Sequence, residues 1–131
     1  MKRIINTPDA PEALGAYNQG VVSGNLLFTA GQIALTKENR RVEDDSIESQ
    51  TRQVMANLTA VLGAAGCHMS DVVMSRIFIR DQAFFAEVNR VYAEYFEGIE
   101  PPARECVVAA PPVEGFDVEV SMIARIPQSS D

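Results

Sequence analysis

Arg104 is the residue whose type and position most clearly allow chemistry in this sequence. It follows Pro101-Pro102-Ala103 and begins a strand-like segment that, after Glu105, is apolar: Cys-Val-Val-Ala-Ala. An unpaired charge is costly to bury, so the guanidinium should be paired or reach a cavity. Its planar fork suits a carboxylate held by two hydrogen bonds. A structural salt bridge to Glu119 or Glu105 explains the position equally well, and the sequence leaves both interpretations open.

Four other residues could contribute to such a site. Cys106 lies two positions after Arg104, hence on the same face of a strand, although a small core residue is the simpler interpretation. Glu119 lies between two valines, where burial would raise its pKa toward a range useful for proton transfer; a surface or salt-bridged carboxylate is the alternative. Tyr17 lies in a loop, where it could close a pocket or merely pack. Gly31 ends a strand and would let a ligand approach the backbone.

The other residue types argue against several common chemistries. His68 is the one histidine, the two lysines are Lys2 and Lys37, and the sequence has no C-x-x-C, H-E-x-x-H, P-loop or G-x-G-x-x-G motif. Metal, nucleotide, nicotinamide and pyridoxal chemistry are therefore disfavoured, and neither a metal nor a cofactor is expected. The net charge of −7 and the scattered arginines argue against nucleic acid as a partner.

The composition indicates a soluble protein of one domain, residues 1–131. No run approaches the ~18 apolar residues of a membrane span, so no membrane partner is expected. The N-terminus lacks the apolar stretch of a secretory signal, and two cysteines are too few for a secreted disulfide framework. We therefore expect a cytoplasmic location.

Hydrophobic patterns predict the elements that would position these residues. A first strand is expected at 2–5, and a hairpin at 19–22 and 26–31 around Ser23-Gly24-Asn25. Two amphipathic helices are predicted. One spans Ser46–Ala65, with Asp45 as cap and Gly66 as stop, and the other spans Gln82–Phe96, with Asp81 as cap. Their expected buried stripes are Ile47, Thr51, Val54, Leu58, Val61, Leu62 and Ala65, then Phe84, Phe85, Val88, Val91, Tyr92, Tyr95 and Phe96. Further strands are expected at 72–79, 104–109 and 117–126.

Two helices cannot cover both faces of a sheet this large, so we expect them to pack on one face. The last strand carries apolar residues on both faces, with Ile123 on the face opposite Val118, Val120 and Met122. A sheet with one face in contact with water would not need apolar residues on that face. We therefore expect other subunits to cover the second face.

Six segments in order resemble the RidA/YjgF family over nearly the whole chain. They are Ala13–Gly20, Phe28–Ile33, Asn57-Leu58 with Leu62–Gly66, Val88-Asn89 with Tyr92 and Tyr95-Phe96, Pro102–Cys106, and Val118–Val120. The resemblance implies an α+β, chorismate-mutase-like fold: a mixed sheet with two helices on one face, and a homotrimer with a β-barrel core and sites between subunits. It also implies hydrolysis of reactive enamines and imines, such as 2-aminoacrylate and 2-iminobutanoate, to 2-keto acids and ammonia.

The resemblance also assigns residues to this activity. It places the carboxylate-binding arginine at Arg104 and the water-positioning acid at Glu119, with further substrate-binding residues at Tyr17, Gly31, Asn89 and Cys106. The chain departs from the family pattern at four positions, which are Ala16, Ala30, Pro101 and Ser121. Common alternatives there are proline, serine, an aromatic residue and a second glutamate, so these departures bear on substrate identity and rate.

Three other functions remain open. The chain could deaminate a larger imino or enamino acid, such as an aminomuconate-like compound. It could be a non-catalytic, keto-acid-binding or chaperone-like protein. Some family members are called ribonucleases, but the lone His68 and the negative charge argue against RNA cleavage.

Overall fold

The computed structural model describes residues 1–128. The chain begins with three antiparallel strands, β1 (Lys2–Ile5), β2 (Gly20–Ser23) and β3 (Leu26–Thr29). Ser23 pairs with Leu26 across a tight turn, in which Gly24 has a φ of 62°, a conformation that glycine adopts without strain. The predicted first strand and hairpin are therefore confirmed.

Helix α1 (Ile47–Ala64) forms as the 3.6-residue pattern predicts. Its predicted stripe is buried, with Ile47 partly so, and Met55 belongs to the core as well. The predicted cap was wrong: the Ser46 side chain, not that of Asp45, accepts the hydrogen bond from the Ser49 backbone N–H. Asp44 instead accepts from the Ser46 N–H and the Ser49 hydroxyl, which fixes the turn before the helix.

The second predicted helix is divided in two. Gln82–Phe84 form a 3₁₀ turn, in which Asp81 accepts from the Ala83 N–H, and helix α2 follows at Phe85–Glu94. Phe85 is 41% exposed, so its place in the predicted buried stripe was wrong. Phe85 lies beside Cys106. Cys106 belongs to an edge strand of the sheet, so no further strand of residues 1–128 covers Phe85 from that side.

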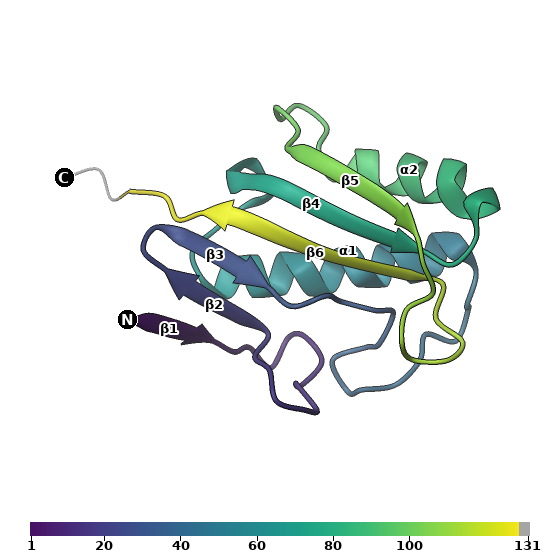
Figure 1. Ribbon diagram of the computed structural model, residues 1–131, viewed down its shortest axis with the longest axis horizontal. Coiled ribbons are helices and arrows are strands. Elements are labelled where there is room, and N and C mark those ends of the chain that lie inside the picture. The colour runs from purple at the N-terminus through teal and green to yellow at the C-terminus, as the bar shows by residue number, and fades with distance from the viewer. Residues whose placement is uncertain (129–131) are drawn as a thin grey trace.

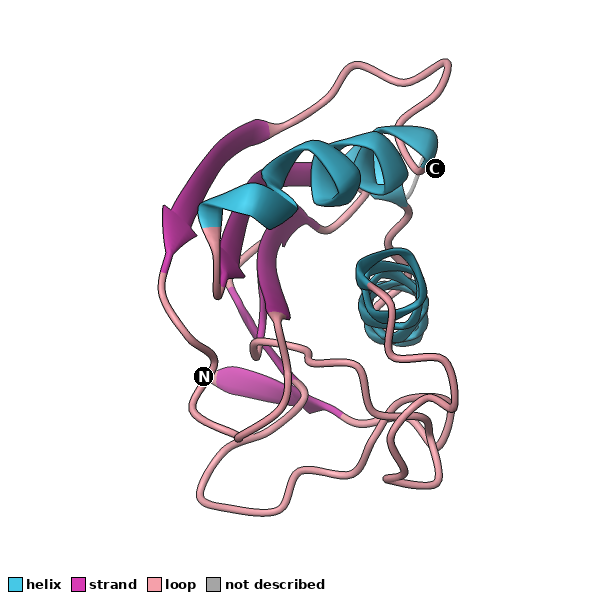
Figure 2. Ribbon diagram, turned by 90° about the vertical axis from the view of Figure 1, so that its right-hand side faces the viewer, coloured by secondary structure: helices cyan, strands magenta, loops and turns pink. Residues whose placement is uncertain are grey.

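Strands β4 (Val72–Ile79), β5 (Ala103–Val108) and β6 (Val118–Arg125) complete one six-stranded sheet, in the order β1-β2-β3-β6-β4-β5. A 3₁₀ turn at Met69–Asp71 precedes β4. Strand β5 runs parallel to β4, whereas β6 pairs antiparallel with both β3 and β4. The sheet is thus mixed, with β1 and β5 at its edges (Figure 1). Figure 2 shows both helices on one side of the sheet, so the α+β class and the one-sided packing are confirmed.

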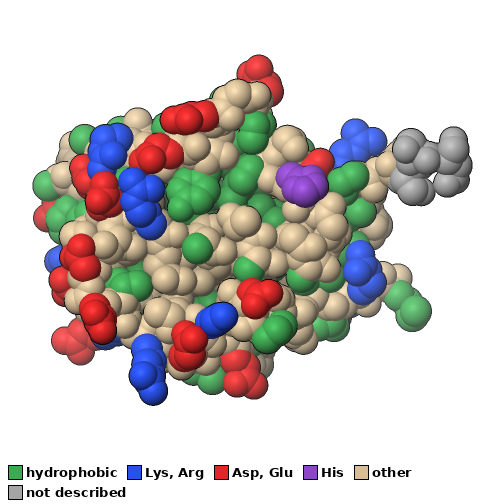
Figure 3. All heavy atoms as spheres, turned by 180° about the vertical axis from the view of Figure 1, so that it is seen from behind, with side chains coloured by type: hydrophobic (Ala, Val, Ile, Leu, Met, Phe, Trp, Pro, Cys, Tyr) green, Lys and Arg blue, Asp and Glu red, His purple; other side chains and the backbone are tan. Residues whose placement is uncertain are grey.

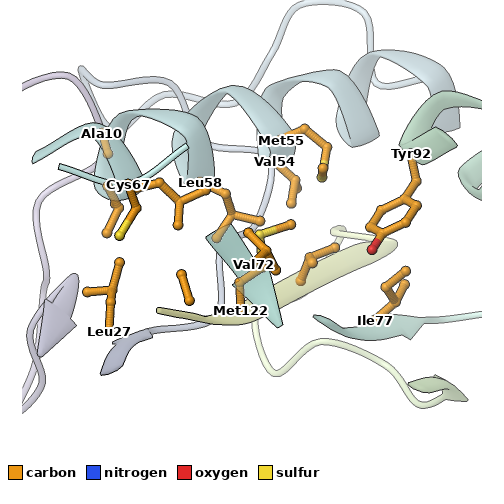
Figure 4. Packing of buried hydrophobic residues seen from close by; sticks show 14 of the residues in the cluster. Ala10, Leu27, Val54, Met55, Leu58, Cys67, Val72, Ile77, Tyr92 and Met122 are labelled. Atoms are coloured by element: carbon orange, nitrogen blue, oxygen red, sulfur yellow. The ribbon is translucent and has the colours of Figure 1, made fainter. Parts of the chain in front are cut away.

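The core lies between the helices and one sheet face, as Figure 4 shows for Leu58 of α1 and Met122 of β6. Every second residue of β6 from Val118 to Ala124 is at most 2% exposed. The outer side of the helices carries acidic and basic side chains next to one another (Figure 3). There Arg90 contacts Glu48 and Glu87, at 2.6 and 2.8 Å.

Within residues 1–128, no helix covers the opposite face of the sheet, which we call the open face (Figure 2). Phe28 and Val107 project from it and are 42% and 46% exposed, while Phe78 and Ile123 are partly buried. Apolar side chains on a free surface favour association.

Candidate functional site

Arg104 lies on β5 with its side chain toward α2. Its Nη1 donates a hydrogen bond to Asn89 Oδ1 at 2.7 Å. The guanidinium carbon lies 5.3 Å from the centroid of the Tyr92 ring and 5.9 Å from that of Phe85. Three residues of one helix face therefore hold the arginine, since positions 85, 89 and 92 recur at helical spacing.

The guanidinium has no acidic partner within residues 1–128. The sequence left two acids as possible partners. Glu105 Oε2 lies 3.9 Å from Arg76 Nε instead, and Glu119 projects from the open face. The structural salt bridge is therefore not formed within this chain. Arg104 is exposed, and an exposed arginine with a neutral amide partner can still bind a carboxylate.

Cys106 lies on the same side of β5 as Arg104, as predicted from the two-residue spacing. It lines an open cavity of about 470 Å³ with residues that include Phe85 and Val108. Burial raises the pKa of the Cys106 thiol, and the nearby positive charge of Arg104 partly opposes this. The thiol is therefore mostly protonated near neutral pH.

Glu119 lies in a second cavity, of about 470 Å³, at one end of the open face. Gly31 lies beside it because Gln32 and Val120 exchange backbone hydrogen bonds of 2.8 and 3.1 Å. A Cβ at Gly31 would lie 2.7 Å from Glu119 Oε2, so glycine is required there for the carboxyl group to keep its position. Burial raises the pKa of Glu119, which favours its use in proton transfer.

Tyr17 also lines this cavity and is 54% exposed. Its loop is fixed by the buried Gln19, whose amide accepts from the Thr7 N–H and donates to the carbonyls of Ala10 and Pro11. Apolar residues of the same cavity come from three separate loops; they are Pro11, Leu14, Ala30, Ile33, Leu35, Pro112 and Val113. Ala30 stands where many family members have serine, so the hydroxyl group that serine would supply is missing from this cavity.

The six candidate residues form two groups that the single chain does not bring together. The Arg104 group (Arg104, Asn89 and Cys106) lies on the helix side of β5. The Glu119 group (Glu119, Gly31 and Tyr17) lies at the open face and its loops. A site that uses both groups must therefore draw them from different copies of the chain.

Two supporting residues were given no role in the site from the sequence. The buried Asn57 donates to the carbonyls of Ile33 and Leu35 and so shapes the wall of the Glu119 cavity. Arg41 donates to the Gly115 carbonyl at 3.2 Å and stacks 4.1 Å above the Phe116 ring, which joins two loops. A buried asparagine in a helix was a possible signal for the first, whereas nothing in the local sequence marks the second.

Residues 1–128 contain no group of three or more His, Cys, Asp or Glu side chains placed to bind a metal. No helix in this part of the chain is long and apolar enough to cross a membrane.

Comparison with known proteins gives one consistent family. The family model described as Endoribonuclease L-PSP matches residues 7–126. A RutC family protein of Synechocystis sp. is 40% identical over 95% of this chain and 97% of its own. The chloroplastic Reactive Intermediate Deaminase A of Arabidopsis thaliana is 37% identical over 95% of this chain and 66% of its own. The crystal structure of E. coli TdcF with bound serine superimposes with a TM-score of 0.87 at 34% identity, and covers 95% of this chain and 99% of that one. The chain therefore belongs to the RidA/YjgF family.

Proposed function

We propose that this chain hydrolyses reactive 2-imino acids, such as 2-iminobutanoate and the imine tautomer of 2-aminoacrylate, to 2-keto acids and ammonia. The observation that carries the proposal is the state of Arg104. Its guanidinium is held by Asn89 and two aromatic rings, yet it has no acidic partner within residues 1–128. A positioned and unneutralised guanidinium is suited to an organic carboxylate.

The reaction needs few groups. Arg104 binds the substrate carboxylate and thereby fixes the position of the adjoining imine carbon. Glu119 accepts a proton from a water molecule as the water oxygen bonds to that carbon. The C=N electron pair moves to the nitrogen, which takes up a proton from solvent, and a carbinolamine results. The amine nitrogen then takes the proton held by Glu119, the C–N bond breaks as the hydroxyl proton passes to solvent, and a 2-keto acid and ammonia leave. General-base help of this kind is worth roughly 10²- to 10⁴-fold.

The two groups can act together if copies of the chain associate through the open face, and we propose a homotrimer with a site at each boundary. The exposed Phe28 and Val107 support association, because water contact with such side chains is unfavourable. Closed cyclic symmetry would then repeat the same contact at each boundary, so a boundary that joins an Arg104 group to a neighbour's Glu119 group would occur three times.

The relatives support the chemistry of the ligand. One relative bears the name Reactive Intermediate Deaminase A, and one solved structure holds serine, which carries an α-carboxylate. Neither name identifies the natural substrate of this chain.

Replacing Arg104 tests the proposal. We expect Arg104→Ala to lose acceleration of ammonia release from imines generated by a pyridoxal-dependent amino-acid dehydratase. The matched control is Arg52→Ala, which also removes one positive charge but from the exposed ion pairs with Glu94 and Glu48. Full activity of Arg104→Ala would remove this residue from the mechanism. If neither the parent nor the control accelerates hydrolysis, yet both bind 2-oxobutanoate, the chain is a keto-acid-binding protein instead.

Mixing two inactive variants tests the shared site. Arg104→Ala and Glu119→Gln subunits are unfolded together at equal amounts and refolded. If one site uses groups from two copies, about a quarter of the boundaries in random trimers combine an intact Arg104 with an intact Glu119. We therefore expect about a quarter of parental activity to return. No recovery, in mixtures shown by native mass spectrometry to contain heterotrimers, would contradict a site shared between copies.

The size of the Glu119 cavity favours one alternative. A cavity of about 470 Å³ with a largely apolar lining is larger than a two-carbon side chain requires. A larger imino or enamino acid is therefore the second candidate substrate. Comparison of kcat/KM across imines of alanine, 2-aminobutanoate, leucine and phenylalanine, generated by an amino-acid oxidase, separates the two.

A further inference from the structure

Arg104 and Ser75 occupy paired positions in neighbouring strands. Their Cα atoms are partners in the parallel register of β4 and β5, and both side chains lie on the helix side of the sheet. Ser75 is fully buried, at 0% exposure, whereas Arg104 is exposed at the sheet edge. A polar side chain with no access to water needs a hydrogen-bond partner.

Tyr92 supplies that partner and touches Arg104 as well. Its hydroxyl donates to Ser75 Oγ at 2.9 Å, and its ring centroid lies 5.3 Å from the Arg104 guanidinium carbon. Figure 4 shows the Tyr92 side chain directed from α2 toward the sheet. With 4% exposure and the Phe96 ring at 4.8 Å, the tyrosine ring has little freedom to move. The hydrogen bond from the Tyr92 hydroxyl to Ser75 fixes the position of the ring between α2 and the sheet.

Arg104 therefore depends on a buried polar pair for its position. Asn89 binds only Nη1, which leaves the other guanidinium N–H groups for a ligand. A single hydrogen bond does not fix a plane, because the guanidinium can rotate about it. The Tyr92 ring supplies a surface that limits this rotation through a cation–π contact.

We propose that Tyr92, anchored by Ser75, is a positioning residue that orients the Arg104 guanidinium for binding of the substrate carboxylate. The inference rests on the proposed function, and it names two residues that act through Arg104 without touching the substrate. Their contribution is made equally in the ground state and the transition state, so it belongs to substrate binding and not to the chemical step.

The test uses the full-length chain and steady-state kinetics. Tyr92→Phe and Ser75→Ala each break the buried hydrogen bond, and Tyr92→Leu removes the ring. We expect Tyr92→Leu to raise KM by about 2- to 5-fold with kcat unchanged, the range that one cation–π contact supports. The two milder variants should raise KM less, and the double variant Ser75→Ala/Tyr92→Phe should restore part of the loss because it leaves no unpaired hydroxyl.

A matched control separates positioning from general loss of packing. Leu62→Ala also truncates a buried core side chain, but Leu62 lies ten residues along α1 from Arg52, where that helix pairs with Glu94 of α2. We expect it to lower the thermal midpoint but leave KM unchanged. A fall in thermal midpoint for the Tyr92 and Ser75 variants with parental KM would overturn the inference.

Arg104→Lys provides the decisive background. Lysine keeps the charge and can still lie over the ring, but its ammonium has no plane for the ring to orient. If Tyr92 acts by orienting the plane of Arg104, Tyr92→Leu raises KM less in that background than in the parent; an equal rise in both backgrounds would contradict the inference. Full activity of Arg104→Ala would instead remove the proposed function itself, whereas an inactive Arg104→Ala with unaffected Tyr92 variants would remove only the role of Tyr92.

Discussion

The Arg104 group and the Glu119 group are built in different ways. Arg104, Asn89 and Tyr92 come from one helix and one strand, so regular geometry fixes their relative positions. The Glu119 cavity is walled by three loops that are distant in sequence and are held by side chains such as Asn57 and Gln19. Under the proposed function, the two groups have different roles. The rigid group suits the binding of an invariant carboxylate, and the loops suit a substituent that varies between substrates.

The largest expected effect separates binding from chemistry. We expect Glu119→Gln to lower kcat by roughly 10²- to 10⁴-fold, because the amide cannot accept the proton of water. Binding of 2-oxobutanoate, measured by calorimetry, should stay close to that of the parent, since Arg104 is unchanged. Much weaker binding of the keto acid by Glu119→Gln would show that Glu119 contributes to binding as well as to the chemical step.

The pH dependence of kcat supplies a check on the same residue. Burial raises the pKa of Glu119 above its ordinary 4.5, so the carboxylate is lost by protonation at a higher pH than for a solvated glutamate. Activity of the parent should therefore fall toward acid with a midpoint above pH 4.5. Glu119→Gln should lack this limb, and a midpoint at or below 4.5 would argue against Glu119 as the base.

A smaller effect is expected from the loop side of the Glu119 group. A Cβ at Gly31 would lie 2.7 Å from Glu119 Oε2, so Gly31→Ala should displace the carboxyl group. Displacement of a catalytic group by about 1 Å can cost up to ~10²-fold in rate, and we expect kcat to fall by up to this amount. Gly63→Ala is the matched control, because a Cβ there meets nothing within 4 Å. Equal activity of the two variants would show that Glu119 tolerates a shift.

Much of the fold was predictable because local patterns agree with it. The hairpin at Gly24, helix α1, and strands β4 and β6 all appear where periodicity places them. Two details failed. The cap is Ser46 and not Asp45, because neighbouring polar residues compete for one helix terminus. The exposure of Phe85 depends on the end of the sheet, which its own helix does not encode.

The sequence alone determined which side chains can do chemistry here: an arginine at the start of an apolar strand and a glutamate between two valines. Only the tertiary structure decided how they are arranged. It placed Arg104 with Asn89 and Tyr92 on one side of the sheet, and Glu119 with Gly31 on the other. The physical reason is that periodicity reports which residues of one element share a face. The strand order that brings β5 beside β4, and sets β6 between β3 and β4, is decided by contacts between segments far apart in the chain.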